Sequence, residues 1–222
     1  MEPGKKNKIL VQCDFDGTIT YKDVSFMLLD HFADSDWRKL LAEYQAGRLS
    51  VGVFNTRAFA MIRVRKNTML DFVARSEEVR VRPGFKELLD YCAEKGLEFV
   101  IVSNGADFYI DAILKNLGMA NIKVYAAQSR FHPGSVEVRY ITPDGSVVQD
   151  RFKEKHTDLF LSQGYRIIYI GNGVSDFSPA QRAEHVFATG ELLKRCRELN
   201  LGCIPFDDLH EVVRGLQRLK LD

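Results

Sequence analysis

Residues 9–20 constrain the fold of this chain more than any other stretch. They open with the nearly continuous apolar run 9–13, which is typical of a strand buried on both faces in a parallel sheet. The run ends at Asp14 and Asp16, two carboxylates one residue apart, and Gly-Thr follows them. Open α/β sheets bind ligands at the carboxyl ends of their strands, so these carboxylates are placed to share one metal ion or one substrate. A strand that ends in an ordinary polar turn is the alternative interpretation.

The rest of the chain alternates between buried strands and amphipathic helices, which predicts an α/β fold with a doubly wound parallel sheet. Over 21–79, apolar residues at helical spacing predict a small helical insert. We therefore expect a core of 1–20 and 80–222 and a helical cap of 21–79. Alternation on either side of Asp144-Gly145 predicts an antiparallel β-hairpin over 135–151, beside the sheet. Further strands are expected at 97–103, 122–127, 165–170 and 185–188, and helices at 83–96, 106–117, 155–162, 190–199 and 208–219.

Composition excludes several classes of protein. A formal net charge of +1 over 222 residues argues against a general nucleic-acid or anionic-membrane binder. No apolar segment reaches the roughly 18 residues of a membrane span, and residues 1–8 run directly into the first strand without the pattern of a signal peptide. The four cysteines are scattered, so free thiols are expected rather than disulfides or a zinc site. We therefore expect a cytoplasmic protein.

Polar clusters follow three of the predicted strands. Asp14 and Asp16 end the first, Ser-Asn-Gly at 103–105 ends the second, and Asn172 and Asp176 follow a third. Because the carboxyl ends of parallel strands point the same way, these clusters are expected to converge at one edge of the sheet.

The string Asp-Phe-Asp-Gly-Thr at 14–18 resembles motif I of the haloacid dehalogenase-like (HAD) phosphohydrolases, and Gly-Asn-Gly-Val-Ser-Asp at 171–176 resembles their last acidic motif. The position of the insert is similar to that of the small helical cap in the phosphoserine phosphatase-like subgroup. Together with Val-Ser-Asn-Gly-Ala-Asp-Phe at 102–108, these strings most resemble the methionine-salvage phosphatases of 2-hydroxy-3-keto-5-methylthiopentenyl-1-phosphate. The resemblance implies a cytoplasmic phosphatase, a monomer or homodimer, acting on a small phosphorylated metabolite without nucleic-acid or membrane partners.

The resemblance also implies a role for each cluster. Asp14 would attack phosphorus and form an aspartyl-phosphate, and Asp16 would serve as general acid and base. Ser103 and the backbone N–H groups near Asn104 and Gly105 would hold phosphoryl oxygens. Because a phosphate dianion repels an attacking carboxylate, Mg²⁺ is the implied cofactor. Its implied ligands are Asp14, Asp16, Asn172 and Asp176.

In the family a lysine completes the phosphate clamp before the strand that carries the last acidic motif. Lys153 and Lys155 are both candidates. Lys153 has a spacing to Asn172 similar to that in relatives. Lys155 is slightly favoured because Leu159 and Phe160 follow it at core-facing offsets.

Two residues of the predicted cap resemble substrate-binding residues of the phosphoserine phosphatase-like subgroup. Asp23 falls where those relatives place an acid that touches the substrate. Arg57 has a spacing that resembles their carboxylate-binding arginine. A solvated charge on a helix face is the alternative interpretation of Arg57.

Asn172 stands where the last acidic motif usually has aspartate. An amide oxygen can ligate Mg²⁺ but carries no charge, and the loss of one charged contact costs about 1–3 kcal/mol. Three functions therefore stay open. The chain is a Mg²⁺-dependent phosphomonoesterase, a phospholigand-binding or regulatory protein without turnover, or a phosphotransferase to an acceptor other than water.

Overall fold

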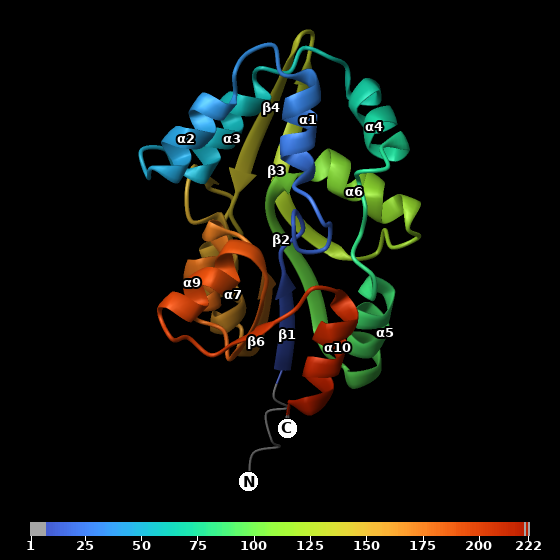
Figure 1. Ribbon diagram of the computed structural model, residues 1–222, viewed down its shortest axis with the longest axis vertical. Helices are drawn as coiled ribbons and strands as arrows, with labels where there is room; N and C mark the ends of the chain where they lie inside the picture. Colours follow the sequence, from blue (N-terminus) through green and yellow to red (C-terminus); the bar gives the residue numbers. More distant parts are fainter. Residues whose placement is uncertain (1–7, 220, 222) are drawn as a thin grey trace.

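An eight-stranded sheet forms the centre of the protein (Figure 1). The computed structural model describes residues 8–219 and 221, so the expectation about the residues that precede the first strand lies outside the described part. The strands are β1 (Lys8–Cys13), β2 (Glu98–Ala106), β3 (Lys123–His132), β4 (Ser135–Ile141), β5 (Val147–Val148), β6 (Tyr165–Gly171), β7 (His185–Ala188) and β8 (Cys203–Pro205). Their spatial order is β5-β4-β3-β2-β1-β6-β7-β8, and neighbouring strands pair parallel except β3 with β4 and β4 with β5, which pair antiparallel.

Strand β1 lies inside the sheet, between β2 and β6. Its apolar residues have almost no exposed surface, as expected for a strand covered on both faces. Gln12, a polar side chain within it, is also buried, and its Oε1 accepts a hydrogen bond from the Thr157 hydroxyl at 2.9 Å. At the end of β1 the backbone N–H of Asp14 donates to the carbonyl of Ile170 at 2.9 Å. This bond fixes the first carboxylate beside the end of β6.

Helices cover both faces of the sheet. Helices α5 and α10 pack together on one side, and α7 and α9 lie on the other (Figure 1). Helix α8 contacts α7. The N-terminus of α10 is capped by Asp208, whose Oδ1 accepts from the N–H of Glu211 at 2.9 Å. The bounds are α5 (Phe85–Lys95), α6 (Asp107–Asn116), α7 (Phe152–Ser162), the 3₁₀ turn η1 (Val174–Asp176), α8 (Phe177–Ala180), α9 (Gly190–Glu198) and α10 (Leu209–Arg218).

Four helices follow β1 before the chain returns to the sheet: α1 (Val24–Phe32), α2 (Arg38–Gln45), α3 (Val51–Phe59) and α4 (Lys66–Arg75). We call them the cap helices. Ser50 caps α3 through the N–H of Val53 at 3.4 Å. The rings of Phe26, Trp37 and Phe54 pack against one another and tie three of these helices together. The α/β fold with a helical insert is confirmed, whereas the division into core and cap domains stays a prediction.

The predicted hairpin is confirmed, since β4 and β5 pair antiparallel around Asp144-Gly145, but its link to the sheet and the last strand were not predicted. Strand β3 continues to His132 and pairs antiparallel with β4, so the hairpin extends the sheet instead of lying beside it. Strand β8 was not predicted, because three residues are too few to show a period of two. None of the helices within the described residues is long and apolar enough to cross a membrane.

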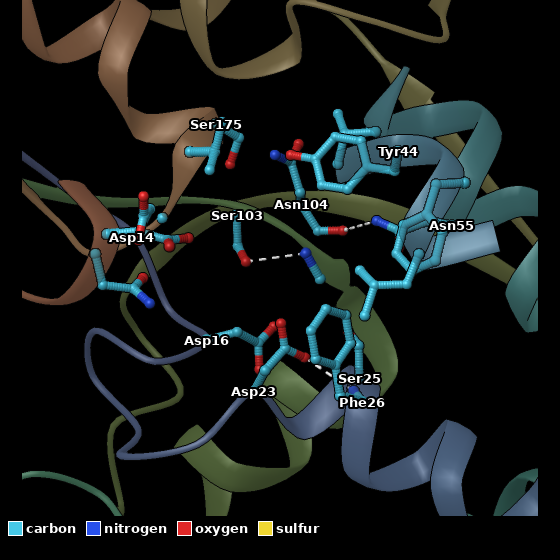
Figure 2. A pocket seen from close by; sticks show the side chains of 18 of the residues that line it. Asp14, Asp16, Asp23, Ser25, Phe26, Tyr44, Asn55, Ser103, Asn104 and Ser175 are labelled. Atoms are coloured by element: carbon cyan, nitrogen blue, oxygen red, sulfur yellow. Dashed lines mark hydrogen bonds between the residues drawn. The ribbon is translucent and has the colours of Figure 1, made fainter. Parts of the chain in front are cut away.

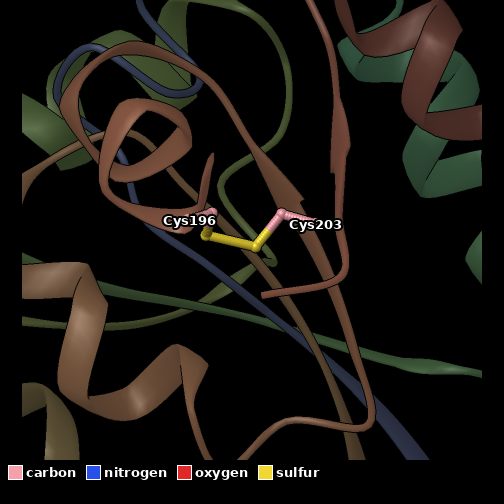
Figure 3. The surroundings of a disulfide bond; sticks show 2 residues. All are labelled: Cys196 and Cys203. Atoms are coloured by element: carbon pink, nitrogen blue, oxygen red, sulfur yellow. A yellow bond between two sulfur atoms is a disulfide. The ribbon is translucent and has the colours of Figure 1, made fainter. Parts of the chain in front are cut away.

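A disulfide joins Cys196 of α9 to Cys203 of β8 (Figure 3), with the two Cα atoms 6.2 Å apart. The expectation that all four cysteines are free thiols is therefore wrong. The chain turns back after α9 and brings the two sulfur atoms together, which a scattered spacing does not reveal. Cys13 and Cys92 are free and buried, as expected.

Candidate active site

A cavity of about 620 Å³ lies where β1, β2 and β6 end, between the sheet and the cap helices (Figure 2). Its volume is in the range of small-molecule sites. Three clusters singled out in the sequence meet at its wall, represented by Asp14 and Asp16, by Ser103 to Gly105, and by Asn172. The predicted convergence of the strand ends is therefore present in the structure.

Lys153 is the lysine that reaches the cavity. Its Nζ lies 2.8 Å from Asp14 Oδ1 and 2.6 Å from Asp176 Oδ1, and only 2% of its side chain is exposed. Burial disfavours the charged ammonium group, but the two carboxylates outweigh this effect and raise the pKa of Lys153. Lys155 is exposed to solvent. The preference for Lys155 was wrong because α7 begins at Phe152, which turns Lys153 inward with Phe152.

Asp176 is the second carboxylate that engages Lys153. Its Oδ1 also accepts from the hydroxyl of Tyr169 at 2.7 Å, and its Oδ2 accepts from the N–H groups of Asn172 at 3.0 Å and Gly173 at 2.8 Å. The side chain is fully buried and is not part of the cavity wall. Protein donors engage both of its oxygens, so Asp176 supports Lys153 and the loop after β6. Its role as a metal ligand stays a prediction.

Asp16 is held by two donors from different elements. Its Oδ1 accepts from the N–H of Val24 at 2.9 Å, and its Oδ2 accepts from the hydroxyl of Tyr109 at 2.5 Å. That hydroxyl also lies 2.7 Å from Ser25 Oγ. Burial, followed by the charge of Asp23, raises the pKa of Asp16 to about 8. A carboxyl group with this pKa keeps a proton near neutral pH, as a general acid must.

Sequence reasoning did not find Tyr109 and Ser25. Tyr109 lies in α6 among apolar residues at helical spacing and is fully buried, so the pattern marks it only as a core residue. Ser25 is the second residue of α1, and nothing in its neighbourhood indicates a partner more than eighty residues away in the chain.

The carboxyl groups outnumber the cations at the cavity wall. Asp14, Asp16 and Asp23 line it, whereas Lys153 is the one lysine or arginine of the described chain that does so. Burial, followed by the charge of Asp176, raises the pKa of Asp14 to about 7. Such a surplus of buried carboxyl groups favours the binding of a further cation.

The donor atoms present suit Mg²⁺. Asp14 and Asp16 supply carboxylate oxygens and Asn172 supplies an amide oxygen, the hard ligands that this ion prefers. Asn172 Oδ1 accepts from the hydroxyl of Thr18 at 2.8 Å, which fixes the amide beside the first motif. Among the described residues, no group of three or more histidine, cysteine or acidic side chains is arranged to hold a metal ion. Water and substrate phosphate would have to complete the coordination shell, as is usual for Mg²⁺.

The end of β2 places Ser103, Asn104 and Gly105 in the cavity wall. Ser103 is fully buried, and its Oγ accepts from the N–H of Gly105 at 3.0 Å. A Cβ atom at Gly105 would collide with the hydroxyl of Tyr109 and with Asp16 Oδ2, so only glycine fits this position. The N-terminus of α6 begins two residues later and adds its positive dipole end.

The two predicted substrate-binding residues of the cap have different outcomes. Asp23 lines the cavity and also caps α1, with its Oδ1 accepting from the N–H of Phe26 at 2.9 Å. Arg57 is exposed and is not part of the cavity wall. That prediction is corrected: α3 turns Phe54 and Asn55 toward the cavity, and Arg57 falls on its outer face. Sequence reasoning did not single out Asn55.

Comparison with known proteins decides the family. The sequence pattern of the haloacid dehalogenase-like hydrolases matches residues 11–181. The chain belongs to the haloacid dehalogenase-like hydrolase family. The matched region of this HAD hydrolase includes every residue that lines the cavity except Glu191.

Curated relatives of similar length carry a phosphatase name. A 2-hydroxy-3-keto-5-methylthiopentenyl-1-phosphate phosphatase of Geobacillus thermodenitrificans is 30% identical over 221 residues, covering 97% of this chain and 99% of the relative. The protein of the same name from Brevibacillus brevis is 28% identical, covering 96% of this chain and 97% of the relative.

Solved structures of phosphoserine phosphatases share the fold. The enzyme from T. onnurineus superimposes with a TM-score of 0.71 at 22% identity, covering 99% of both chains. A substrate-bound phosphoserine phosphatase complex gives a TM-score of 0.70 at 18% identity, covering 95% of this HAD hydrolase and 99% of that chain. The predictions of the HAD family, of the fold and of a phosphatase are confirmed by these comparisons.

Proposed function

We propose that this HAD hydrolase is a Mg²⁺-dependent phosphomonoesterase that acts on a small metabolite through an aspartyl-phosphate at Asp14. The observation that carries the proposal is the buried lysine between two carboxylates. Lys153 engages Asp14 Oδ1 at 2.8 Å, which leaves Oδ2 as the oxygen for attack on phosphorus. Asp176, on the far side of the ammonium group, keeps Lys153 in place.

The residues around Asp14 supply the remaining roles. Lys153, the Ser103 hydroxyl and the N-terminus of α6 offer positive charge and donors to the phosphoryl oxygens. Asp16, with its raised pKa, donates a proton to the leaving alkoxide and then accepts one from the hydrolytic water. Tyr109 and the N–H of Val24 hold Asp16 in one orientation for both steps.

Bound Mg²⁺ would offset the negative charge of the phosphate dianion as the carboxylate approaches it. Asp14, Asp16 and Asn172 are the residues that would hold it. The neutral Asn172 leaves this set one charge short, which favours a second candidate, a phospholigand-binding protein without turnover. The third candidate is a phosphotransferase, which would pass the phosphoryl group to an alcohol instead of water.

The test is phosphate release from a panel of phosphomonoesters with Mg²⁺ and with excess EDTA. The first substrates are 2-hydroxy-3-keto-5-methylthiopentenyl-1-phosphate and phosphoserine, because the relatives and the solved structures carry these names. We expect Mg²⁺-dependent release that disappears in Asp14→Asn. Thermal stabilisation by the phosphoesters without turnover would support the binding protein, and phosphorylated products in added alcohols would support the phosphotransferase.

A further inference from the structure

Arg82 lies where the two connections between the sheet and the cap helices run side by side. The connection that leaves β1 passes through Thr20, the one that returns to α5 passes through Val81, and these two residues form an antiparallel bridge. The N–H of Arg82 donates to the carbonyl of Ile19 at 2.8 Å. The backbone of Arg82 is therefore fixed beside the loop that follows β1.

The guanidinium group of Arg82 bridges two main-chain carbonyls. Its Nη2 donates to the carbonyl of Gly17 at 3.2 Å, and its Nη1 donates to the carbonyl of Asp207 at 2.5 Å. The group also lies over the rings of Tyr21 and Phe206, 4.6 and 5.9 Å from their centroids. One side chain thus joins the loop after β1 to the segment that precedes α10.

The peptide group between Gly17 and Thr18 is the part of the site that Arg82 contacts. Its carbonyl accepts from Arg82, and its N–H donates to the carbonyl of Phe15 at 3.2 Å. Asn172 packs against this peptide, because a Cβ atom on Gly17 would lie 2.3 Å from Asn172 Nδ2. The hydroxyl of Thr18 donates to Asn172 Oδ1 at 2.8 Å. A shift of the peptide would therefore move the group that fixes the amide of Asn172.

The position of the guanidinium group is unfavourable for stability. Its Nε atom is buried and has no hydrogen-bond partner among the described residues. Burial also lowers the pKa of Arg82, because the charged form loses hydration. Unpaired buried donors are uncommon in proteins, and each one calls for a reason. Stability alone gives no reason for an arginine at this position.

We propose that Arg82 is a positioning residue of the active site, which fixes the Gly17–Thr18 peptide and, through the Thr18 hydroxyl, the amide of Asn172. Arg82 does not line the cavity, so it acts through this peptide and not on the substrate. The proposal rests on the proposed phosphatase function, since it assumes that Asn172 belongs to the Mg²⁺ site.

The test replaces Arg82 by methionine, which keeps an unbranched side chain but removes both donors. Mg²⁺ affinity is measured by calorimetry without substrate, and the loss of hydrogen bonding should raise the dissociation constant about three- to tenfold. The loop also carries Asp16, so kcat at saturating Mg²⁺ should fall about tenfold. KM should change by less than about twofold, because Ser103 and Lys153 lie on other elements.

Arg80→Met is the matched control. Arg80 also lies over the ring of Tyr21, 5.7 Å from its centroid, but it is exposed and its side chain makes no hydrogen bond to the described loop after β1. This variant should keep the Mg²⁺ affinity and kcat of the wild type. Thr18→Val removes the hydroxyl at similar volume and should weaken Mg²⁺ binding about as much as Arg82→Met. The double variant of Thr18 and Arg82 should be no weaker than the weaker single variant, because both changes interrupt the same contacts.

Several results would overturn the positioning role. They are an unchanged Mg²⁺ dissociation constant in Arg82→Met, an equal loss in Arg80→Met, and additive effects in the double variant. A lower free energy of unfolding in Arg82→Met, with Mg²⁺ affinity and kcat unchanged, would show a structural role only. If Arg82→Met does not fold, Thr18→Val and Arg82→Lys decide, because a lysine ammonium group cannot reproduce the planar fork that engages both carbonyls. Unchanged Mg²⁺ affinity in both would refute the proposal.

The positioning role and the phosphatase can fail separately, since Mg²⁺ binding is measured without substrate. Weaker Mg²⁺ binding by Arg82→Met, in a protein whose wild type releases no phosphate, would support the positioning role and reject the phosphatase. Phosphate release by the wild type, with equal Mg²⁺ affinities for wild type and Arg82→Met, would reject the positioning role alone.

Discussion

Replacement of Lys153 tests the charge arrangement of the site most sharply, with Lys155 of the same helix as the matched control. Lys153→Met removes an ammonium group that lies 2.8 Å from Asp14 and 2.6 Å from Asp176. Both carboxylates then remain buried without their cation. Breaking a buried ion pair in this way costs about 3–5 kcal/mol. Lys155→Met alters an exposed side chain and should change stability by no more than about 0.5 kcal/mol.

The loss of stability should depend on pH in a defined direction. Without Lys153, burial raises the pKa of both carboxyl groups in the folded state above the value in the unfolded chain. The folded variant then binds more protons than its unfolded chain. Its stability therefore falls as pH rises from the carboxyl pKa of the unfolded chain to the higher pKa of the folded state. In the wild type the ion pair with Lys153 lowers the pKa of Asp176. The contribution of this ion pair to stability is instead lost as pH falls. The difference between wild type and variant should therefore be larger at pH 8 than at pH 5.

The assay is urea unfolding followed by circular dichroism, in EDTA so that metal binding does not contribute. Phosphate release at pH 7 is measured in parallel, and Lys153→Met should lower it at least a hundredfold because a preorganised charge at the phosphoryl group is lost. A stability loss below about 1 kcal/mol for Lys153→Met, or equal losses for the two lysine variants, would refute this reasoning.

Three further changes have defined outcomes. Tyr109→Phe removes the 2.5 Å donor to Asp16 and should lower kcat about threefold to tenfold, since a hydrogen bond between neutral groups contributes about 0.5–1.5 kcal/mol. An unchanged kcat would contradict the positioning of the general acid. Asn172→Asp should tighten Mg²⁺ binding about tenfold in calorimetry by adding a charged ligand, and equal affinity would exclude position 172 from the metal site. Reduction of the Cys196–Cys203 disulfide, with a sequence separation of 7, should lower the free energy of unfolding by about 2–3 kcal/mol; urea curves that coincide with and without dithiothreitol would argue against the bridge.

Much of the fold and of the site was predictable because strand ends carry a local signal. The apolar run before Asp14 and the Ser-Asn-Gly end of β2 each combine a hydrophobic period with an abrupt change to polar residues. Parallel topology then brings the ends of separate strands together without further information. The three polar clusters could therefore be assigned to one site from the sequence.

The errors concern orientation, which depends on where a helix begins. A start of α7 three residues earlier than predicted turns Lys153 inward and Lys155 outward. In α3 the helical period of about 3.6 residues per turn directs Asn55 to the cavity and Arg57 to solvent. Tyr109 is a different case, because its role depends on a contact with Asp16, far away in the chain, that local patterns do not encode.

The phosphorylation state of Asp14 during turnover tests the central claim most directly. Protein mixed with phosphorus-labelled substrate and Mg²⁺ is quenched in acid, digested and mapped by mass spectrometry. The proposed mechanism predicts a phosphoryl group on the peptide that contains Asp14, absent from Asp14→Asn protein. Turnover with the label on another residue, or with phosphate release retained in Asp14→Asn, would contradict it.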